Sequence, residues 1–363
     1  LFRGLGDDEP DRLKRYIFPL EARFVSPGMV RTGSLLAAIE LLEGGVTTVA
    51  DMYYFETEVG RAVDEAGLRG VVGQSIVDFA APDAPTTEDG FALFDRLVED
   101  YAGHPRVTPS IAPHAPYTTG LEILRRVDAA ARRAAAPVQI HLAEMDYEMP
   151  WVRERYGGTP VDLLEQAGLL REGVVAAHCL WVDAADIASL ARGGVGVAHN
   201  IGANTKGGRG IAPVRDMLAA GVRVGLGSDG PMSGNTIDLL AQLPQVAKMQ
   251  KLRAQDRTVM TAAEVVRLAT RGGAEVLGMA DRIGSIEPGR RADLVRIGRR
   301  SARMQPLHDA HSALVYAAQS GDVRDVLVDG RFVVRDGRIT TIDREAVFAE
   351  AAAIAGAMRR SLG

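Results

Sequence analysis

The chain has 363 residues, of which 47% are hydrophobic and 25% are charged, a balance typical of globular proteins that bury a sizeable core. Its formal net charge is −5 and its Lys and Arg residues are spread along the chain, which argues against nucleic acid as a partner. The absence of an apolar run of about 18 residues and of a signal-peptide pattern, together with a single cysteine, Cys179, predicts a cytoplasmic protein without a membrane span or a disulfide framework.

Seven short apolar runs rich in β-branched residues alternate with helical segments. In chain order, the predicted strands are residues 46–52, 69–76, 106–113, 138–142, 174–179, 195–200 and 222–229. Leucines and isoleucines at helical spacing predict helices between them, at 120–136, 160–170 and 183–193. Because such alternation is typical of β/α units and a parallel sheet, we predict an α/β fold.

Five polar side chains lie at or just after the carboxyl end of a predicted strand: His114, His141, His178, His199 and Asp229. A doubly wound sheet and a (β/α)8 barrel both satisfy the alternation, but only a barrel brings such ends together at one mouth. We therefore predict a (β/α)8 TIM barrel. Seven strands are one short of closure, and because the chain starts abruptly at Leu1, the first strand is expected upstream of that residue.

The alternation of strands and helices ends after the last β/α unit. Residues 260–279 predict a helix pair broken at Gly272 and Gly273. Short strands joined by EPG and DG turn signals follow in 283–298 and 323–340, and they predict a small β-sandwich appendage. The Ala-rich end predicts a terminal helix with basic residues in its last turn. The expected organisation is a barrel at 1–281, a β-appendage at 282–342 and a C-terminal helix at 343–363.

The stretch VQIHLAEMDYE, residues 138–148, begins as a buried strand and ends in ionisable groups. His141, with Glu144 three residues later, offers one metal ligand and one group able to move protons. Taken alone, the pair is more simply interpreted as a capping arrangement at the strand end. Asp229 follows another strand among glycines and would face the mouth unobstructed, although an Asx-turn or a helix N-cap is a common alternative.

Two further histidines join this set. His178 ends a strand after two alanines, where a hydrogen-bonded core histidine is the common alternative. His114 lies between prolines, which fix the local backbone and hence the direction of the imidazole, unless the segment is merely a rigid loop. A metal-assisted hydrolase is favoured, because stability alone does not account for so many ionisable strand ends at one mouth.

A series of motifs runs through nearly the whole chain. In order they read LFRG, DDEP, IFPLEA, GGVTTVADM, VDFAAPDAP, APHAPYT, HLAE, AHCLWVD, GIAPV, GLGSDG and IGSIEPGRRADLV. With these motifs the sequence resembles the amidohydrolase superfamily, and within it the branch of adenosine-type, methylthioadenosine/S-adenosylhomocysteine and triazine hydrolases, which includes chlorohydrolases. The order of the motifs is highly specific for the superfamily and less specific for any one substrate.

The resemblance implies one divalent metal ion, usually zinc, held by an HxH pair on the first strand, a histidine on the fifth and an aspartate on the eighth. In this chain His141 and Asp229 match the last two positions. The HxH pair is expected upstream of Leu1, a few residues before the LFRG motif. Iron remains possible because histidine and aspartate ligands accept both metals. The metal would activate water for attack on a ring carbon that bears an amino group.

The resemblance also implies roles for the surrounding residues. Glu144 would protonate the adjacent ring nitrogen, His178 would hydrogen-bond the attacking water, and Asp229 would accept a proton destined for the departing ammonia. Glu21 and His114 match positions that contact sugar and base in nucleoside-handling members, although Glu21 could instead be an ordinary exposed carboxylate. The expected partner is a small heterocyclic substrate, and homo-oligomers are usual in such proteins.

One segment departs from the family pattern. Where these deaminases usually carry SNMKLASG, this chain reads GANTKGGRG at 202–210, which keeps Asn204 and Lys206 but adds glycines and Arg209. The leading hypothesis is a metal-dependent hydrolytic deaminase of an aminated purine, nucleoside or related heterocycle. Two alternatives stay open: a chlorohydrolase or other aminohydrolase of a triazine, guanine or pterin-like ring, and a catalytically silent barrel that lacks the HxH ligands.

Overall fold

A computed structural model describes residues 1–9 and 11–362 of the chain. Its main element is a parallel sheet of seven strands in the order β1-β2-β3-β4-β5-β6-β7. The strands are β1 Thr48–Tyr53, β2 Arg69–Ile76, β3 Val107–Pro113, β4 Val138–Leu142, β5 Val174–His178, β6 Gly196–His199 and β7 Arg223–Leu226. Each predicted strand is confirmed, and at least one helix separates each strand from the next, as parallel pairing requires.

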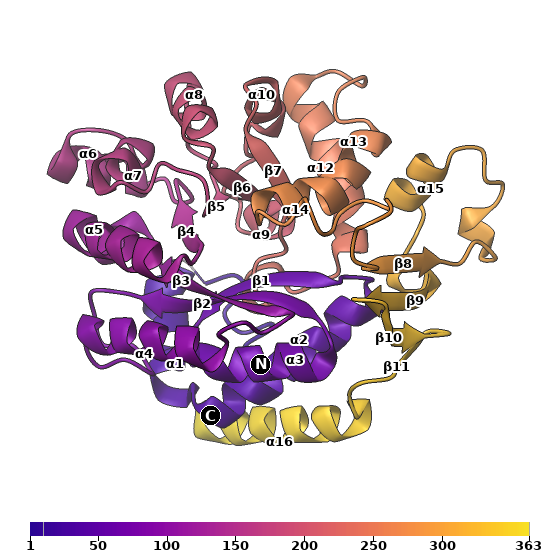
Figure 1. The fold of residues 1–363 in the computed structure, drawn as a ribbon, viewed down its shortest axis with the longest axis horizontal. Helices are drawn as coiled ribbons and strands as arrows, with labels where there is room; N and C mark the ends of the chain where they lie inside the picture. The colour runs from indigo at the N-terminus through magenta and orange to yellow at the C-terminus, as the bar shows by residue number, and fades with distance from the viewer. Residues whose placement is uncertain (10, 363) are drawn as a thin grey trace.

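The sheet curls into an incomplete barrel (Figure 1). Within the described residues, β1 and β7 are its two ends and do not pair with each other. Side chains are buried on both faces of the sheet, as in β2, where every residue is buried. The barrel-like parallel sheet agrees with the prediction, whereas an eighth strand stays a prediction.

Helices surround the curled sheet (Figure 1). The α-helices are α1 Phe18–Phe24, α2 Pro27–Glu43, α3 Glu56–Ala66, α4 Thr87–Asp100, α5 Pro116–Ala134, α6 Glu148–Tyr156, α7 Pro160–Ala167, α8 Ala184–Gly193, α9 Ile201–Lys206, α10 Val214–Ala219, α11 Pro231–Gly234, α12 Leu239–Ala254, α13 Ala262–Arg267, α14 Gly273–Val276, α15 Ala310–Tyr316 and α16 Arg344–Leu362. Shorter helical turns are the π-helical η1 Leu13–Ile17 and η2 Leu268–Gly272 and the 3-10 turns η3 Ala302–Met304 and η4 Ser320–Asp322. Capping boxes at Thr86, Thr159 and Asp183 set the starts of α4, α7 and α8. In the part of the chain that the structure describes, no helix has both the length and the apolar character that crossing a membrane requires.

The prediction of a broken helix pair near residue 272 is wrong. α13, η2 and α14 follow one another without interruption, and both Gly272 and Gly273 have helical dihedral angles. A side chain at Gly272 would collide with the carbonyl oxygen of Val224 in β7. Glycine is therefore needed at this position because the helix packs closely against the sheet. The Gly272-Gly273 pair does not interrupt the helix.

Four short strands form a second, antiparallel sheet in the order β11-β10-β9-β8. They are β8 Leu294–Ile297, β9 Val323–Val328, β10 Arg331–Arg335 and β11 Arg338–Ile339. The DG pairs Asp329-Gly330 and Asp336-Gly337 join β9 to β10 and β10 to β11, and all four residues have positive φ, the geometry of type I′ hairpin turns. Valines of β9 and β10 belong to the same hydrophobic core as the large sheet. The small sheet agrees with the predicted appendage, and the second layer of a sandwich stays a prediction.

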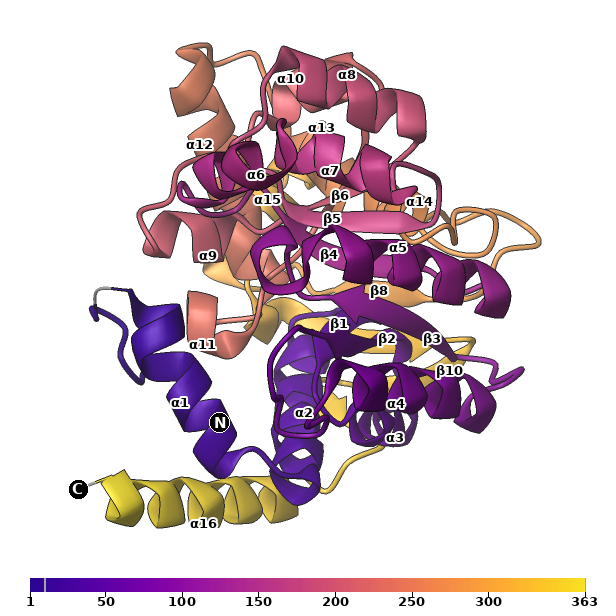
Figure 2. The same cartoon turned by 90° about the vertical axis from the view of Figure 1, so that its left-hand side faces the viewer.

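The C-terminal helix α16 packs against α2 at the edge of the molecule (Figure 2). Its Met358 packs with Phe2, Leu20 and Met29 in a small hydrophobic cluster apart from the main core. The predicted terminal helix is thus present, and it packs against the first residues of the chain.

Candidate active site

The carboxyl ends of β3, β4, β5 and β7 bring four of the predicted residues together. The ring centroids of His114 and His141 are 4.9 Å apart, and those of His141 and His178 are 5.5 Å apart in a stacked arrangement. His178 Nε2 lies 3.9 Å from Asp229 Oδ2. These four residues come from segments 114 to 229 of the chain, so the curl of the sheet creates the cluster.

Glu144 completes the cluster. Its Oε1 lies 3.7 Å from His178 Nε2, and donor atoms of Glu144, His178 and Asp229 all lie within 4.8 Å of one another. His141 Nδ1 is 2.7 Å from the carbonyl oxygen of His114, so Nδ1 carries the proton and donates it, and Nε2 is left as a potential ligand. Nitrogen and carboxylate oxygen donors suit zinc or iron, so the chemistry of the residues present fits a divalent metal.

Non-glycine residues at this mouth have left-handed backbone conformations, among them Ala143, His178, Cys179 and Asp229. The φ angles are 49° at Ala143, 75° at His178 and 59° at Asp229. Such residues cost free energy relative to ordinary conformations and are concentrated at functional sites, where the surrounding structure holds them. The backbone of the HLAE loop and of the two strand ends is therefore bent to aim its side chains.

α9 orients His178 from the side. His178 is almost fully buried, and its Nδ1 lies 2.8 Å from Oδ1 of Asn204, which is also fully buried. Because an amide oxygen only accepts, Nδ1 carries the proton, and Nε2 is the atom directed toward Glu144 and Asp229. Asn204 is thus a positioning residue for His178. This hydrogen bond gives a reason why the altered 202–210 segment keeps the asparagine.

The carboxylate of Glu144 receives an ion pair from Arg209. Burial raises the pKa of Glu144, but the charges of His178 and Arg209 outweigh this effect and hold that pKa at about 2. Glu144 is therefore a carboxylate across the physiological range.

Glu148 supports the HLAE loop from below, a role that the sequence did not reveal. It is fully buried and accepts hydrogen bonds from the backbone N–H groups of Ala143, at 2.8 Å, and Glu144, at 3.1 Å. Burial raises its pKa to about 8, against these hydrogen bonds. The available signal was a second glutamate four residues after Glu144 at the end of the ionisable cluster.

The two predicted substrate residues lie at the same end of the sheet in different ways. His114 is in contact with the cluster, and burial lowers its pKa to about 3, so its imidazole is neutral. Glu21 is buried in α1 and accepts a hydrogen bond from the Tyr53 hydroxyl at 2.7 Å, and burial raises its pKa to about 7. Phe18 of the same helix lies against His114, with ring centroids 6.0 Å apart, which brings α1 to the mouth. Glu21 is thus no ordinary exposed carboxylate.

His199 differs from the other strand-end histidines. It is fully buried at the end of β6, and within the described residues neither ring nitrogen has a hydrogen-bond partner. Burial lowers its pKa to about 4, so it is neutral at pH 7. The possible metal donors grouped among the described residues are Glu144, His178 and Asp229, without His199, although His178 is near enough to lower the pKa of His199 further.

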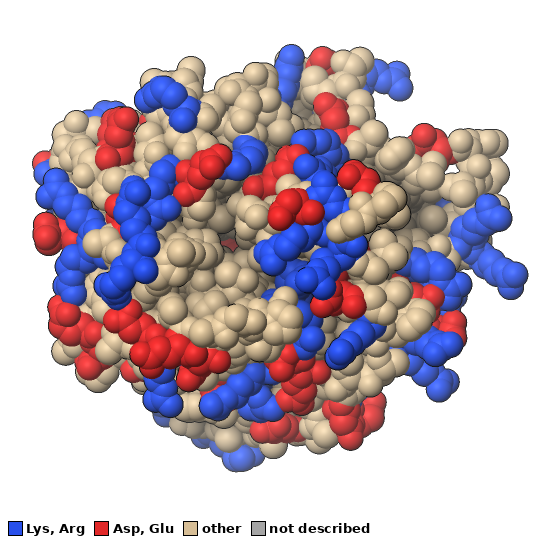
Figure 3. All heavy atoms as spheres, in the orientation of Figure 1, with Lys and Arg blue, Asp and Glu red and all other residues tan. Residues whose placement is uncertain are grey.

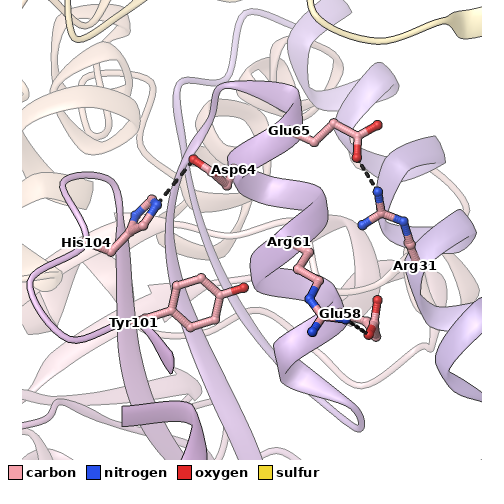
Figure 4. A pocket seen from close by; sticks show the side chains of 7 residues that line it. All are labelled: Arg31, Glu58, Arg61, Asp64, Glu65, Tyr101 and His104. Carbon is pink, nitrogen blue, oxygen red and sulfur yellow. Dashed lines mark hydrogen bonds and ion pairs between the residues drawn. The ribbon is translucent and has the colours of Figure 1, made fainter. Parts of the chain in front are cut away.

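Charged residues elsewhere on the surface pair with one another. Figure 3 shows both signs of charge interspersed over one face. In the groove between α2, α3 and the end of α4, Arg31 pairs with Glu65, and His104 Nε2 lies 3.4 Å from Asp64 Oδ1 (Figure 4). The residues that line this groove do not belong to the strand-end cluster, and their charged side chains pair with one another.

The motifs, the curled sheet and the metal-type cluster find a common counterpart among known proteins. The model of the amidohydrolase family matches residues 3–333. This chain belongs to the amidohydrolase family. A 5-methylthioadenosine/S-adenosylhomocysteine deaminase of Syntrophobacter fumaroxidans is 42% identical over 349 residues, covering 96% of this chain and 80% of that protein. The protein of the same name from Thermodesulfovibrio yellowstonii is 39% identical over 347 residues, covering 95% and 79%.

Solved structures of this amidohydrolase's relatives have the same fold. An adenosine deaminase from Xanthomonas campestris with bound zinc superimposes with a TM-score of 0.96 at 34% identity, covering 99% of this chain and 82% of that one. A mutant atrazine chlorohydrolase from Arthrobacter aurescens, complexed with zinc and atraton, has a TM-score of 0.85 at 26% identity, covering 91% and 77%.

Proposed function

We propose that this amidohydrolase is a zinc-dependent hydrolytic deaminase that releases ammonia from an aminated purine nucleoside such as 5-methylthioadenosine, S-adenosylhomocysteine or adenosine. The observation that carries the proposal is the grouping of Glu144 with His178 and Asp229 within 4.8 Å, because it puts a proton carrier beside metal-type donors. The names of the relatives at about 40% identity support the substrate class.

His141 and Asp229 would be two of the protein ligands that hold the metal. The zinc in related structures supports this metal. When bound, zinc lowers the pKa of water enough to make hydroxide available near neutral pH.

The protein's own groups would manage the protons. Glu144 is ionised, so it can take a proton from water and deliver it to the ring nitrogen beside the reacting carbon, which otherwise develops negative charge. His178, oriented by Asn204, would donate or accept a hydrogen bond at the attacking oxygen through Nε2. Asp229 would receive the second proton and pass it to the leaving amino group.

Two residues would bind substrate. Glu21, held by Tyr53, would accept hydrogen bonds from the ribose hydroxyls, and the neutral His114 would contact the base. Three broader predictions go with this proposal: domain boundaries at 281/282 and 342/343, a cytoplasmic location and a homo-oligomeric state.

A second candidate keeps the site and changes the leaving group. The likeness to an atrazine chlorohydrolase at a TM-score of 0.85 favours hydrolysis of a chlorinated or aminated triazine ring. Glu144 favours deamination, because protonation of the ring nitrogen matters most when the leaving group is poor.

The test is ammonia release by the zinc-loaded protein from adenosine, methylthioadenosine, S-adenosylhomocysteine, guanine, a pterin and an aminotriazine, with chloride release from a chlorotriazine alongside. Ammonia from a purine nucleoside is expected. Chloride release alone would favour the second candidate. A silent panel with zinc measured at full occupancy would reject both and support a catalytically silent barrel.

A further inference from the structure

A cavity lies at the end of the large sheet opposite to the candidate active site. Its lining includes Val71 near the start of β2, Thr108 near the start of β3 and Gly173 just before β5. The starts of parallel strands share one end of a curled sheet, whereas the candidate active site lies at the carboxyl ends. The cavity has a volume of about 360 Å³, which is within the range of small-molecule sites.

One side of this cavity is apolar. Val71 and Met279 are almost fully buried and belong to a small hydrophobic cluster that is separate from the main core. Leu277 packs against that cluster, and Ala131 and Pro137 extend the apolar lining. This surface can hold the apolar part of a ligand away from water.

Three arginines from separate segments line the same cavity: Arg132 in the last turn of α5, Arg171 in the loop before β5 and Arg282 in the loop after α14. Among the described residues of the lining, Glu172 is the one acid. Its side chain is 81% exposed and lies 3.5 Å from Arg223, a cation outside the lining. The lining therefore carries an excess of positive charge.

The fold compensates these three arginines only in part. One carboxylate serves two of them, because Asp128 Oδ2 accepts a hydrogen bond from Arg132 Nε at 2.7 Å and Oδ1 accepts one from Arg171 Nε at 2.8 Å. Arg282 is exposed, and its side chain has no ion pair or hydrogen bond within the described part of the chain. Its neighbour Asp281 is also exposed and does not line the cavity. Arg282 thus offers a free guanidinium group.

The end of α5 at this cavity does not cancel the positive charge. A helix C-terminus carries partial negative charge on carbonyl groups that lack partners. Here the carbonyl oxygen of Ala131 accepts a hydrogen bond from the backbone N–H of Ala136 at 2.9 Å, and that of Arg132 accepts one from Ala135 at 3.3 Å. The helix end is therefore capped, and the full charge of Arg132 lies in the same turn.

The groove of Figure 4 shows what a compensated set of charges looks like. There, each cation of the lining has an acidic partner, in the pairs Arg31 with Glu65, Arg61 with Glu58, and His104 with Asp64. The cavity at the strand starts lacks such pairing at Arg282 and adds an apolar side. That combination matches an anion with an apolar body, since the planar fork of arginine fits phosphate and carboxylate groups.

We propose that this cavity is a binding site for a small organic phosphate monoester, whose phosphate pairs with Arg282 beside Arg132 and Arg171 and whose apolar body lies against Val71 and Met279. A phosphate monoester carries a charge of about −1.5 to −2 at pH 7 and so matches more than one guanidinium group, unlike a carboxylate. The site lies apart from the strand-end cluster and does not depend on the proposed deaminase reaction.

The test uses phenyl phosphate as the probe, with inorganic phosphate, which lacks the apolar body, and benzoate, which keeps the ring but carries a single charge. The variants are Arg282→Ser, Arg282→Lys and, as a matched control, Arg300→Ser. Arg300 is likewise exposed and without an ion pair among the described residues, and it does not line the cavity. The readouts are the Kd of each compound by calorimetry and the inhibition of ammonia release by phenyl phosphate.

Phenyl phosphate is expected to saturate a site with a Kd below about 1 mM and to bind more tightly than inorganic phosphate or benzoate. Arg282→Ser should raise this Kd by about 10-fold to 100-fold, the effect of losing a charged hydrogen bond. Arg282→Lys should recover part of the affinity, and Arg300→Ser should leave the Kd as in the wild type.

Absence of saturable binding, or a Kd that Arg282→Ser leaves unchanged, would overturn the proposal. Binding that ignores Arg282 and competes with the nucleoside substrate would assign the probe to the strand-end cluster instead. Tighter binding of benzoate than of phenyl phosphate would reject the phosphate class. None of these results would bear on the proposed deaminase function, which ammonia release tests separately.

Discussion

At the mouth of the curled sheet, Glu144 is buried among His178 and Arg209, whereas at the start of α3, Glu56 is buried against Asp51. The pKa of Glu144 is low because positive neighbours outweigh burial. The pKa of Glu56 is raised well above its usual value by burial first and by the Asp51 carboxylate second. Two buried glutamates therefore have pKa values shifted in opposite directions, and the charge of the partner decides the direction.

The largest effect is expected from Glu144→Gln. The amide cannot carry a proton between water and ring, so kcat should fall by about 10²-fold to 10⁴-fold while the zinc content stays at the wild-type level. Ammonia release and metal analysis of the same preparation check this. Turnover within a factor of two of wild type would remove Glu144 from the reaction.

Asp229→Ala should change the affinity for zinc, in contrast to Glu144→Gln, which should change proton transfer. Losing one carboxylate ligand should weaken zinc affinity by at least about tenfold and lower activity in parallel, with activity partly restored by added zinc. Competition with a zinc chelator measures the affinity. An unaltered zinc affinity would count against Asp229 as a ligand.

Glu148→Ala should lower both stability and activity. Its removal leaves the backbone N–H groups of Ala143 and Glu144 without acceptors, at about 1–3 kcal/mol for each buried group. Urea unfolding of the variant measures the loss. Glu148→Gln is the control, because its amide oxygen can still accept one of the two hydrogen bonds, and a loss as large as that of the alanine variant would contradict the hydrogen-bond explanation.

Glu56→Gln should give the smallest effect, and only on the pH dependence of stability. Because the folded-state pKa of Glu56 is raised, the folded state holds its proton more tightly, and the free energy of unfolding falls as pH rises above the unfolded-state pKa of about 4.3. The glutamine variant lacks this loss, so its stability relative to wild type should grow from pH 4 to pH 8. Thermal unfolding across that range checks the trend against Glu122→Gln, an exposed control. A constant difference between Glu56→Gln and wild type would show that Glu56 does not titrate differently on folding.

Local patterns in the sequence predicted the seven parallel strands, the hairpin turns at the DG pairs and the gathering of His114, His141, His178 and Asp229. The strands and turns depend on side-chain periodicity or turn chemistry within about ten residues, and the gathering of the four residues follows from the common mouth of a barrel built from those strands. The same local reasoning failed at Gly272, because glycine there serves contact with β7 rather than a break in the helix.

Only the tertiary structure brought Arg209 to Glu144, set Glu148 under the HLAE loop and bent the backbone at His178 and Asp229 into left-handed conformations. The ion pair between Arg209 and Glu144 joins segments that are distant in the chain. It depends on how the sheet curls and on how the glycine-rich loop that carries Arg209 crosses the mouth of the sheet. Backbone strain likewise leaves no periodic signal in the sequence, because it is the surrounding packing that holds it. The sequence by itself thus determined which groups are available for chemistry, and the fold decided their partners and hence their charge.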